Sequence, residues 1–383
     1  MKYSKEEVLQ YVNEEDVKFI RLAFCDIFGN QKNVSIMPSE LDRAFRSGIA
    51  IDGSALAGFN SLPHSDLIIH PDPATLSVLP WRPDHGKVVR MFCSITDSRK
   101  EKYGADTRAF LNTAVSMAEK AGVSVSIGTD MTFYLFKCDE HESSAGIPYD
   151  NGGYMDIAPL DRGENVRREI CLYLEKMGIT PVSSHHEEGP GQNIIKFRDS
   201  DPEKSADNTV TFKSVVSTVC SMCGLSADFS INPVEGMAKN KTKINICVKS
   251  KFGEDITCRF AAGIISHFRE ISLFLSTSES AYTDSDGLSH IRFFSGGRQD
   301  NKIEISLPYS QGNPYLSYAL LIYAGLDGVE SKPETVSKSD HLDSCEKQTL
   351  ALPKNITEAK KAALDSDFIK KHITEEIANS YLF

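Results

Sequence analysis

Carboxylates and one lysine stand at alternating positions of short apolar segments, and these are the residues that could do chemistry. In residues 125–135, Asp130 and Thr132 share one face of a strand, while apolar side chains take the other face. Two similar runs, residues 243–248 and 302–307, carry Lys243 and Glu304. Carboxylate oxygens are ligands for hard divalent metal ions, and a lysine ammonium can hold two carboxylates together in place of a metal ion.

These positions need a sheet to bring them together, and the sequence predicts one. Two amphipathic segments, residues 108–120 and 164–177, have one apolar helical face, and each is followed by a glycine that can end a helix. Runs of strand length cover residues 193–197, 243–248 and 302–307. The predicted fold class is therefore α+β, a sheet with helices packed on one side.

The N-terminal part has a different pattern. From residue 17 to 97, apolar and polar residues alternate in short runs broken by turn residues, which is typical of a small, mostly β domain. A charged, glycine-containing segment follows. We predict an N-terminal domain over residues 1–97, a linker over 98–106 and a C-terminal domain over 107–383.

Composition and net charge argue against two classes of partner, nucleic acids and anionic membranes. The 383 residues are 40% hydrophobic and 25% charged, with a formal net charge of -11. That balance predicts a globular protein that binds neither nucleic acid nor an anionic membrane surface. The first residues have no apolar core of signal-peptide length, so a cytoplasmic location is expected. The nine cysteines are an odd number, and we expect reduced thiols, including the Cys220/Cys223 pair.

Several short motifs, in the same order, resemble type I glutamine synthetases. They are Ile51-Asp52-Gly53-Ser54, Gly128 to Phe136, His185-His186-Glu187, Gly191-Gln192, Ala206-Asp207-Asn208 and Asn313-Pro314-Tyr315-Leu316. The resemblance implies a small β-grasp N-terminal domain followed by a glutamine synthetase-like catalytic domain. It also implies a ring-shaped homo-oligomer with sites between neighbouring subunits, and a reaction in which ATP and Mg²⁺ or Mn²⁺ join ammonia to glutamate.

The six metal-ligand positions implied by the resemblance are only half retained. Acids stand at three of them: Asp130, Glu187 and Glu304. The other three positions hold Thr132, Ile194 and Lys243. A hydrocarbon side chain cannot coordinate a hard cation, and a lysine repels one. We therefore interpret the three acids as remnants of an empty metal site. At these positions we expect Lys243 to pair with Asp130 and Glu304 in place of the metal; the alternative is that Lys243 extends into solvent.

Other family positions are weaker signals. Asp52 matches the residue that holds ammonium, but Asp-Gly-Ser is also a ready turn, which is the reading we favour. Phe212, Asn245 and Arg292 match the nucleotide or anion cleft. Between Tyr282 and Ile291 the chain is shorter than the family, so the flap over the active site is expected to be missing.

Three functions remain open. The first is a pseudoenzyme that has lost ATP-dependent ligase activity and serves as a regulatory or binding subunit, without cofactors, in a ring of its own or with an active glutamine synthetase or another protein. The second is a divergent ATP-dependent glutamate-amine ligase with one Mg²⁺ or Mn²⁺. The third is a metal-free sensor of small anions.

Overall fold

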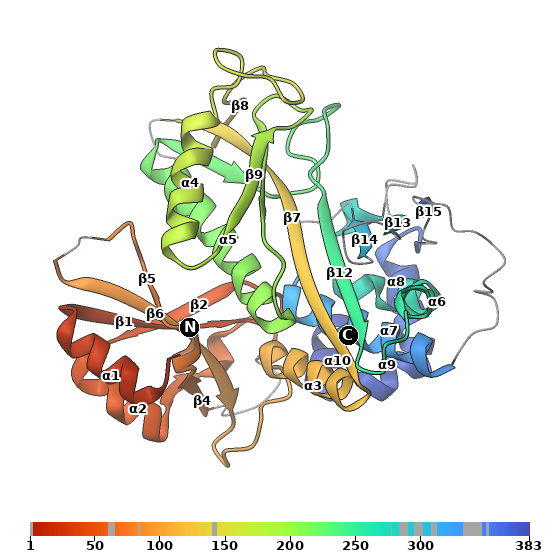
Figure 1. Ribbon diagram of the computed structural model, residues 1–383, viewed down its shortest axis with the longest axis horizontal. Coiled ribbons are helices and arrows are strands. Elements are labelled where there is room, and N and C mark those ends of the chain that lie inside the picture. Colours follow the sequence, from red (N-terminus) through yellow and green to blue (C-terminus); the bar gives the residue numbers. More distant parts are fainter. Residues whose placement is uncertain are drawn as a thin grey trace.

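The computed structural model describes residues 3–59, 66–82, 85–139, 144–276, 278–282, 290–294, 302–307, 312–331, 347–349 and 352–383. The N-terminal sheet and its two helices form one part of the molecule, and a long curved sheet with most of the helices forms the other (Figure 1). The two parts correspond to the small β domain and the α+β domain that the sequence predicts.

The N-terminal part is a six-stranded sheet with the strand order β2-β1-β6-β4-β3, and β5 also pairs with β6. Strands β1 and β6 run parallel, whereas β1 and β2 are antiparallel. Helix α1 starts with a capping box, in which Ser4 and Glu7 satisfy each other's backbone N–H groups. The elements are α1 (Lys5–Glu14), β1 (Val17–Cys25), β2 (Gln31–Ile36), α2 (Leu41–Ser47), β3 (Ile49–Asp52), β4 (Asp66–Pro71), β5 (Ser77–Val78) and β6 (Lys87–Thr96).

The C-terminal part is organised by one long strand, β7 (Val123–Cys138). In the sheet order β15-β13-β14-β12-β7-β10-β9, β7 lies between β12 and β10, and β8 and β11 pair with it too. All of these contacts are antiparallel. The other strands are β8 (Ser144–Pro148), β9 (Pro181–His186), β10 (Gln192–Phe197), β11 (Leu225–Asp228), β12 (Thr242–Ser250), β13 (His290–Phe294), β14 (Lys302–Leu307) and β15 (Lys347–Thr349).

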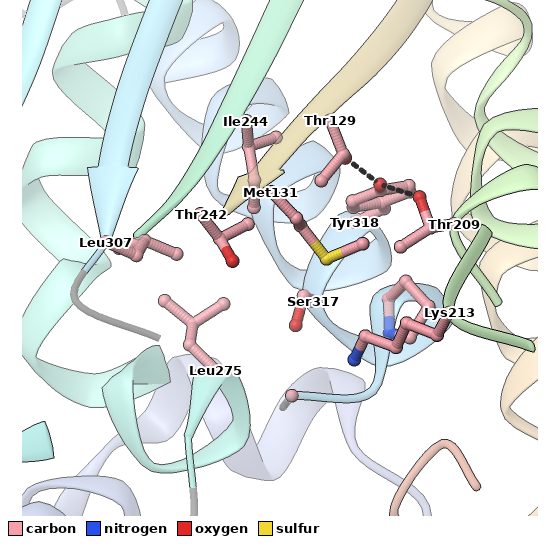
Figure 2. Close-up of a pocket in the computed structure, with 12 residues that line it drawn as sticks. Thr129, Met131, Thr209, Lys213, Thr242, Ile244, Leu275, Leu307, Ser317 and Tyr318 are labelled. Atoms are coloured by element: carbon pink, nitrogen blue, oxygen red, sulfur yellow. Dashed lines mark hydrogen bonds between the residues drawn. The ribbon is translucent and has the colours of Figure 1, made fainter. Parts of the chain in front are cut away.

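The helices cover the apolar face of this sheet. Alternation along β7 sends Ile127, Met131 and Phe133 into the core, where α5 and α7 pack. Figure 2 shows Thr129 and Met131 of β7 directed toward Tyr318 of α7. The helices are α3 (Thr107–Lys120), α4 (Glu164–Lys176), α5 (Pro202–Met222), α6 (Thr257–Leu275), α7 (Pro314–Ser331), α8 (Ile356–Asp365), α9 (Asp367–His372) and α10 (Glu375–Leu382).

The segment predicted as a linker is partly built into the core. Tyr103, Ala105 and Asp106 are buried, and the Asp106 carboxylate accepts hydrogen bonds from the first backbone N–H groups of α3. Asp106 also accepts a hydrogen bond from the Ile95 backbone N–H of β6, at 2.7 Å. The segment therefore joins the last strand of the N-terminal sheet rigidly to α3. Among the described helices, none has the length and apolar character needed to cross a membrane.

Candidate functional site

Four neighbouring strands bring the residues singled out in the sequence onto one face of the sheet. In the β7–β12 register Lys243 lies opposite Asp130, and in the β7–β10 register Ile194 lies opposite Thr132. On β14, Glu304 lies opposite Asn245. Positions that are distant in the sequence are therefore neighbours on the face that points away from the helical core, as alternation predicted.

Asp130 is held by an amide and surrounded by lysines. Its Oδ2 accepts a hydrogen bond from Asn245 Nδ2 at 3.3 Å. Burial raises the pKa of Asp130, while Lys196, the Asn245 hydrogen bond, Lys302 and Lys243 oppose that rise. A carboxylate in this setting can bind a cation or accept further hydrogen bonds.

The expected ion pair of Lys243 with Asp130 and Glu304 is wrong. Within the described part of the chain, Lys243 forms no ion pair at or below 4.0 Å. Asn245 contacts Asp130 instead. Burial raises the pKa of both Asp130 and Glu187, and the Lys243 charge opposes this rise from farther away. The Glu304 Oε1 atom is buried and has no hydrogen-bond partner among the described groups.

Thr132 holds a loop over the face instead of pointing into open space. Its hydroxyl donates to Asn240 Oδ1 at 3.0 Å and accepts from the Lys241 backbone N–H at 2.8 Å. The Tyr134 hydroxyl donates to the Ala238 carbonyl of the same loop. Asn240 is itself fully buried, and its amide donates to the Asp228 and Ser230 carbonyls. The loop of residues 236–241, which we call the covering loop, is therefore fixed against β7.

Strand β10 completes this closed surface. Ile194 is 4% exposed and lies between Thr132 of β7 and His185 of β9. Two residues earlier, Gln192 donates from Nε2 to the Lys239 carbonyl at 3.1 Å. Ile194 thus has apolar burial as its role, and Gln192 adds another contact to the covering loop.

Glu187 follows β9, at the edge of the same region. Its backbone N–H donates to the Gln192 carbonyl at 2.8 Å, and its Oε1 lies 3.7 Å from His185 Nδ1. Burial raises the pKa of the Glu187 carboxyl, against the charges of His185 and the nearby lysines. His185 and Glu187 therefore lie on the same side of the strand, whereas His186, between them, is directed to the other side and contacts Asp150.

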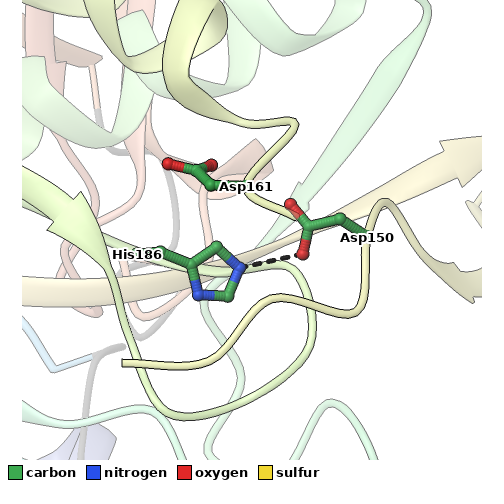
Figure 3. Close-up of side chains that lie close together, drawn as sticks. All are labelled: Asp150, Asp161 and His186. Carbon is green, nitrogen blue, oxygen red and sulfur yellow. Dashed lines mark hydrogen bonds and ion pairs between the residues drawn. The ribbon is translucent and has the colours of Figure 1, made fainter. Parts of the chain in front are cut away.

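His186 belongs to a separate buried cluster that the sequence did not indicate. Asp150, Asp161 and His186 each offer a ligand atom, all within 4.8 Å of one another (Figure 3). These atoms already have partners: His186 Nε2 lies 2.8 Å from Asp150 Oδ1, and Arg167 pairs with both oxygens of Asp161. Since 36 residues separate His186 from Asp150, no local pattern could have shown the pair. We read the cluster as an ion-pair network, because a metal would have to displace these partners.

Of the remaining predicted residues, Asp52 makes the contact favoured from the sequence, whereas Phe212 does not lie where it was expected. Asp52 is exposed, and its Oδ1 accepts from the Ser54 N–H and hydroxyl at 2.9 and 2.6 Å, which is the turn contact favoured from the sequence. The placement of Phe212 in a nucleotide cleft is wrong. Its ring is fully buried against Phe133 and Phe229, because its helix turns it toward the apolar face of the sheet.

The last two predictions fall mostly outside the described residues. Arg292 pairs with Glu304 in the backbone register of β13 and β14, but its side chain lies outside the described part. The position of the missing flap falls on residues 283–289, which also lie outside it.

Comparison with known proteins settles the family. The profile of the glutamine synthetase catalytic domain matches residues 104–284 and 256–383, and that of the glutamine synthetase β-grasp domain matches residues 16–98. The chain belongs to the glutamine synthetase family. The glutamine synthetase of Methanosarcina mazei is 33% identical over 413 aligned residues, covering 99% of this chain and 92% of the relative. That of Clostridium saccharobutylicum is 30% identical, covering 100% and 94%.

Solved structures agree on the fold. The structure of apo GmaS without ligand superposes with a TM-score of 0.84 at 22% identity, over 98% of this chain and 93% of that one. The Plasmodium falciparum glutamine synthetase gives 0.83 at 19% identity, over 100% and 95%. The family and the two-part architecture expected from the motifs are confirmed.

Proposed function

We propose that this member of the glutamine synthetase family has lost ATP-dependent ligase activity and acts as a binding or regulatory subunit. The observation that carries the proposal is the covering loop, which is fixed by Thr132, Tyr134 and Gln192 on the face where the family positions its metals. Of the groups that would face a cation, the Thr132 hydroxyl and the Asp130 carboxylate are hydrogen-bonded to protein instead.

The donor set supports this proposal. Mg²⁺ and Mn²⁺ favour octahedral shells of oxygen ligands. Ile194 has no donor atom, the Thr132 hydroxyl is engaged by Asn240 and Lys241, and Lys243 adds positive charge beside Asp130. These residues do not fit a pair of divalent ions.

Chain length also supports the proposal. The alignment with the Methanosarcina mazei enzyme spans 413 positions, more than the 383 residues of this chain. The relative therefore carries segments for which this chain has no counterpart. Loss of a flap that shields the reaction from water would weaken catalysis further.

A second candidate is a glutamate-amine ligase that uses one divalent ion. The buried Glu304 Oε1, which lacks a described hydrogen-bond partner, favours a cation at this point, with Asp130 and Glu187 as further ligands. The relatives from Methanosarcina mazei and Clostridium saccharobutylicum are named glutamine synthetases, which also supports retained activity. A third candidate, a small-anion sensor, is supported by Lys196, Lys243 and Lys302 near Asp130.

An assay of hydroxamate formation from glutamate and hydroxylamine, with ATP and either Mg²⁺ or Mn²⁺, separates these functions. We expect turnover below about 0.01 s⁻¹, low for an enzyme, while an active glutamine synthetase serves as the positive control. Turnover above that level would favour the ligase. A titration of the active enzyme with this chain tests the regulatory role.

Restoring the ligands gives a second test. The variant with Thr132→Glu, Ile194→Glu and Lys243→His should bind Mn²⁺ more tightly than the natural sequence, measured by the electron paramagnetic resonance signal of free Mn²⁺. Matched substitution of the three positions by Gln, Gln and Asn controls for disruption of the covering loop. Equal, tight Mn²⁺ binding by the natural sequence and the restored variant would contradict the proposed loss of the metal site.

We further propose a homo-oligomeric ring. One segment after β8 exposes large apolar side chains: Tyr154 at 57%, Met155 at 56%, Ile157 at 78% and Leu160 at 56%. Contiguous exposed apolar groups of this kind mark interaction surfaces. Light scattering coupled to size exclusion should show an assembly, and Ile157→Asp should reduce its mass if this segment contributes.

A further inference from the structure

A small cavity lies on the opposite face of the sheet from Asp130. It measures about 30 Å³, room for one or two water molecules, and lies between β7, β12, α5 and the start of α7. Among the described residues, its polar lining comes from Thr129, Thr209, Lys213, Thr242, Ser317 and Tyr318, and none of these carries a carboxylate. Figure 2 shows Lys213, Thr242 and Ser317 converging on the hollow from three different elements.

Half of this polar lining is already engaged. Thr209 donates its hydroxyl proton to the Ser205 carbonyl at 2.9 Å, so it accepts from the Tyr318 hydroxyl, which lies 3.0 Å away. Tyr318 in turn accepts from the Thr129 hydroxyl. The three hydroxyls form a hydrogen-bonded chain directed away from the cavity. A ligand in the cavity would therefore be bound by the other three polar groups.

The other three polar groups, Lys213, Thr242 and Ser317, can donate hydrogen bonds into the cavity. Thr242 is 8% exposed, and its buried Oγ1 has no hydrogen-bond partner among the described atoms. A buried hydroxyl without a partner is destabilising, and a ligand that accepts its hydrogen bond would offset that cost. Within the described residues, the Ser317 hydroxyl and the Lys213 ammonium have no hydrogen bond or ion pair either. Burial lowers the pKa of Lys213 to about 8, so the amine is still mostly protonated at neutral pH.

The start of α7 adds further positive potential. Gly312, Pro314 and Ser317 line the cavity, and α7 runs for 18 residues from Pro314. Asn313 Oδ1 accepts from the Tyr315 and Leu316 N–H groups, but one carboxamide does not cancel the partial positive charge at a helix N-terminus. Lys213 and the helix end therefore give the cavity the same sign of charge.

We propose that this cavity binds a small inorganic anion of halide size, held by the Lys213 ammonium, the Thr242 hydroxyl and the Ser317 hydroxyl. A cation, two unengaged hydroxyl donors and a helix N-terminus meet there, and no carboxylate of the described part of the chain lines the cavity with them. Room for one or two water molecules is room for one halide ion. This anion site is independent of the proposed loss of ligase activity, because it lies on the other face of the sheet and uses none of the metal positions.

Crystals of the full chain soaked in sodium bromide test the site directly. We expect an anomalous peak in the cavity, within about 3.5 Å of Lys213 Nζ and Thr242 Oγ1, since this is the outer limit of a useful polar contact. A cavity without bromine signal, while other bromide ions are visible on the surface, would overturn the proposal. Continuous density joining the amine to a covalent adduct would do so too.

Solution measurements with matched variants give an independent readout. Line broadening of ³⁵Cl⁻ in nuclear magnetic resonance, at constant ionic strength with gluconate as the replacement anion, should reveal chloride exchange. We expect Lys213→Met to weaken chloride binding at least tenfold and Thr242→Val to weaken it severalfold. Lys241→Met, which removes a lysine from the covering loop on the opposite face, should leave it unchanged.

The pattern across the variants decides the outcome. Circular dichroism and gel filtration confirm that each variant is folded. Since Lys213→Met removes a buried charge, we expect this variant to fold. Chloride binding lost in Lys241→Met but kept in Lys213→Met would place the anion on the other face and refute the cavity site.

Discussion

At the scale of single residues, the buried pair Asp150–His186 shows how charge can serve structure instead of catalysis. His186 Nδ1 lies 2.7 Å from the Glu187 carbonyl and Nε2 lies 2.8 Å from Asp150 Oδ1. Both ring nitrogens face acceptors, so the doubly protonated imidazolium is favoured. Against the opposing effect of burial, these contacts raise the pKa of His186 and lower the pKa of Asp150 to about 2.

The two pKa shifts predict the pH range in which the Asp150–His186 pair stabilises the folded protein. Because the pKa of His186 is raised in the folded protein, its contribution to the free energy of unfolding is complete below pH 6.5. This contribution is lost as the pH rises through the folded-state pKa. Because the pKa of Asp150 is lowered from 3.8, its contribution is present above 3.8 and is lost as pH falls toward about 2. Asp150→Asn should therefore lower the free energy of unfolding most between these limits, by about 2 kcal/mol.

Urea unfolding of Asp150→Asn and the natural sequence at pH 4.5, 5.5, 7.5 and 9 measures the difference. Asp201→Asn is the control, since Asp201 is exposed and its side chain makes no cap hydrogen bond. If the loss for Asp150→Asn stayed constant from pH 5.5 to 9, His186 would not be the charged partner.

Thr132 gives a second prediction at this scale. Thr132→Val keeps the shape but removes the hydroxyl that contacts Asn240 and the Lys241 N–H. The Lys241 N–H would lose its partner, and Asn240 Oδ1 would keep only the 3.4 Å contact from Gln192 Nε2. This should cost about 1–3 kcal/mol and accelerate hydrogen exchange at the Lys241 amide. Ser124→Val, at an exposed position on the same face of β7, should change neither quantity. Unchanged exchange at Lys241 would show that Thr132 does not hold the covering loop.

At the scale of elements, the crossing of α6 and α7 depends on glycine. A Cβ on Gly263 would lie 2.1 Å from the Ala324 carbonyl oxygen, and one on Gly328 would lie 2.3 Å from the Arg259 carbonyl oxygen. The two backbones therefore approach more closely than any other residue type permits. Helix α7 is buried along most of its length, so this crossing sets how the helical layer sits on the sheet.

Gly263→Ala tests the crossing. In an isolated helix the change would stabilise by about 1 kcal/mol, but here the overpacking against α7 should exceed that gain. We expect a net loss of about 2 kcal/mol or more in the free energy of unfolding, measured by urea denaturation. Ser266→Ala, at an exposed position of α6, is the control. A Gly263→Ala variant as stable as the natural protein would contradict the close packing.

At the scale of the whole molecule, one buried arginine joins the two parts. Arg108 at the start of α3 pairs with Asp207 and Glu203 of α5 and with Asp72 of the N-terminal part, at 3.1, 2.9 and 3.0 Å. The pKa of Arg108 lies well above its usual value: burial opposes this rise, while Asp207 and Glu203 cause it. The junction is thus an ion network with a cation at its centre.

Arg108→Met should leave three carboxylates facing each other without their cation. We expect a loss of about 3–5 kcal/mol, because removing one partner leaves buried charge uncompensated. The single tryptophan, Trp81, lies in the N-terminal part with its ring centroid 6.2 Å from that of Tyr173 of α4, so its fluorescence reports contact between the parts.

Thermal unfolding followed by both Trp81 fluorescence and far-ultraviolet circular dichroism provides the measurement. In the natural protein the two transitions should coincide, and in Arg108→Met the fluorescence transition should come first. Arg99→Met, which removes an exposed arginine paired with Asp97, is the control. Coincident, unshifted transitions in Arg108→Met would mean that the network does not couple the two parts.

The sequence by itself determined the family, the two-part fold and the shared face of the candidate site. Strand alternation has a period of two, so the side of Asp130, Thr132 and Glu304 follows from local pattern. The motifs identified the family because their order and spacing persist along the chain. The turn role of Asp52 was equally local, since its partner Ser54 is two residues away.

The tertiary structure decided which partners those residues have. Asn245 contacts Asp130 where Lys243 was expected, Phe212 turned into the core, and Asp150 met His186 across 36 residues. A hydrogen bond depends on distances of a few tenths of an ångström, which are set by packing between segments far apart in the chain. Local pattern fixes the side on which a residue lies, whereas the partner found there is a property of the folded molecule.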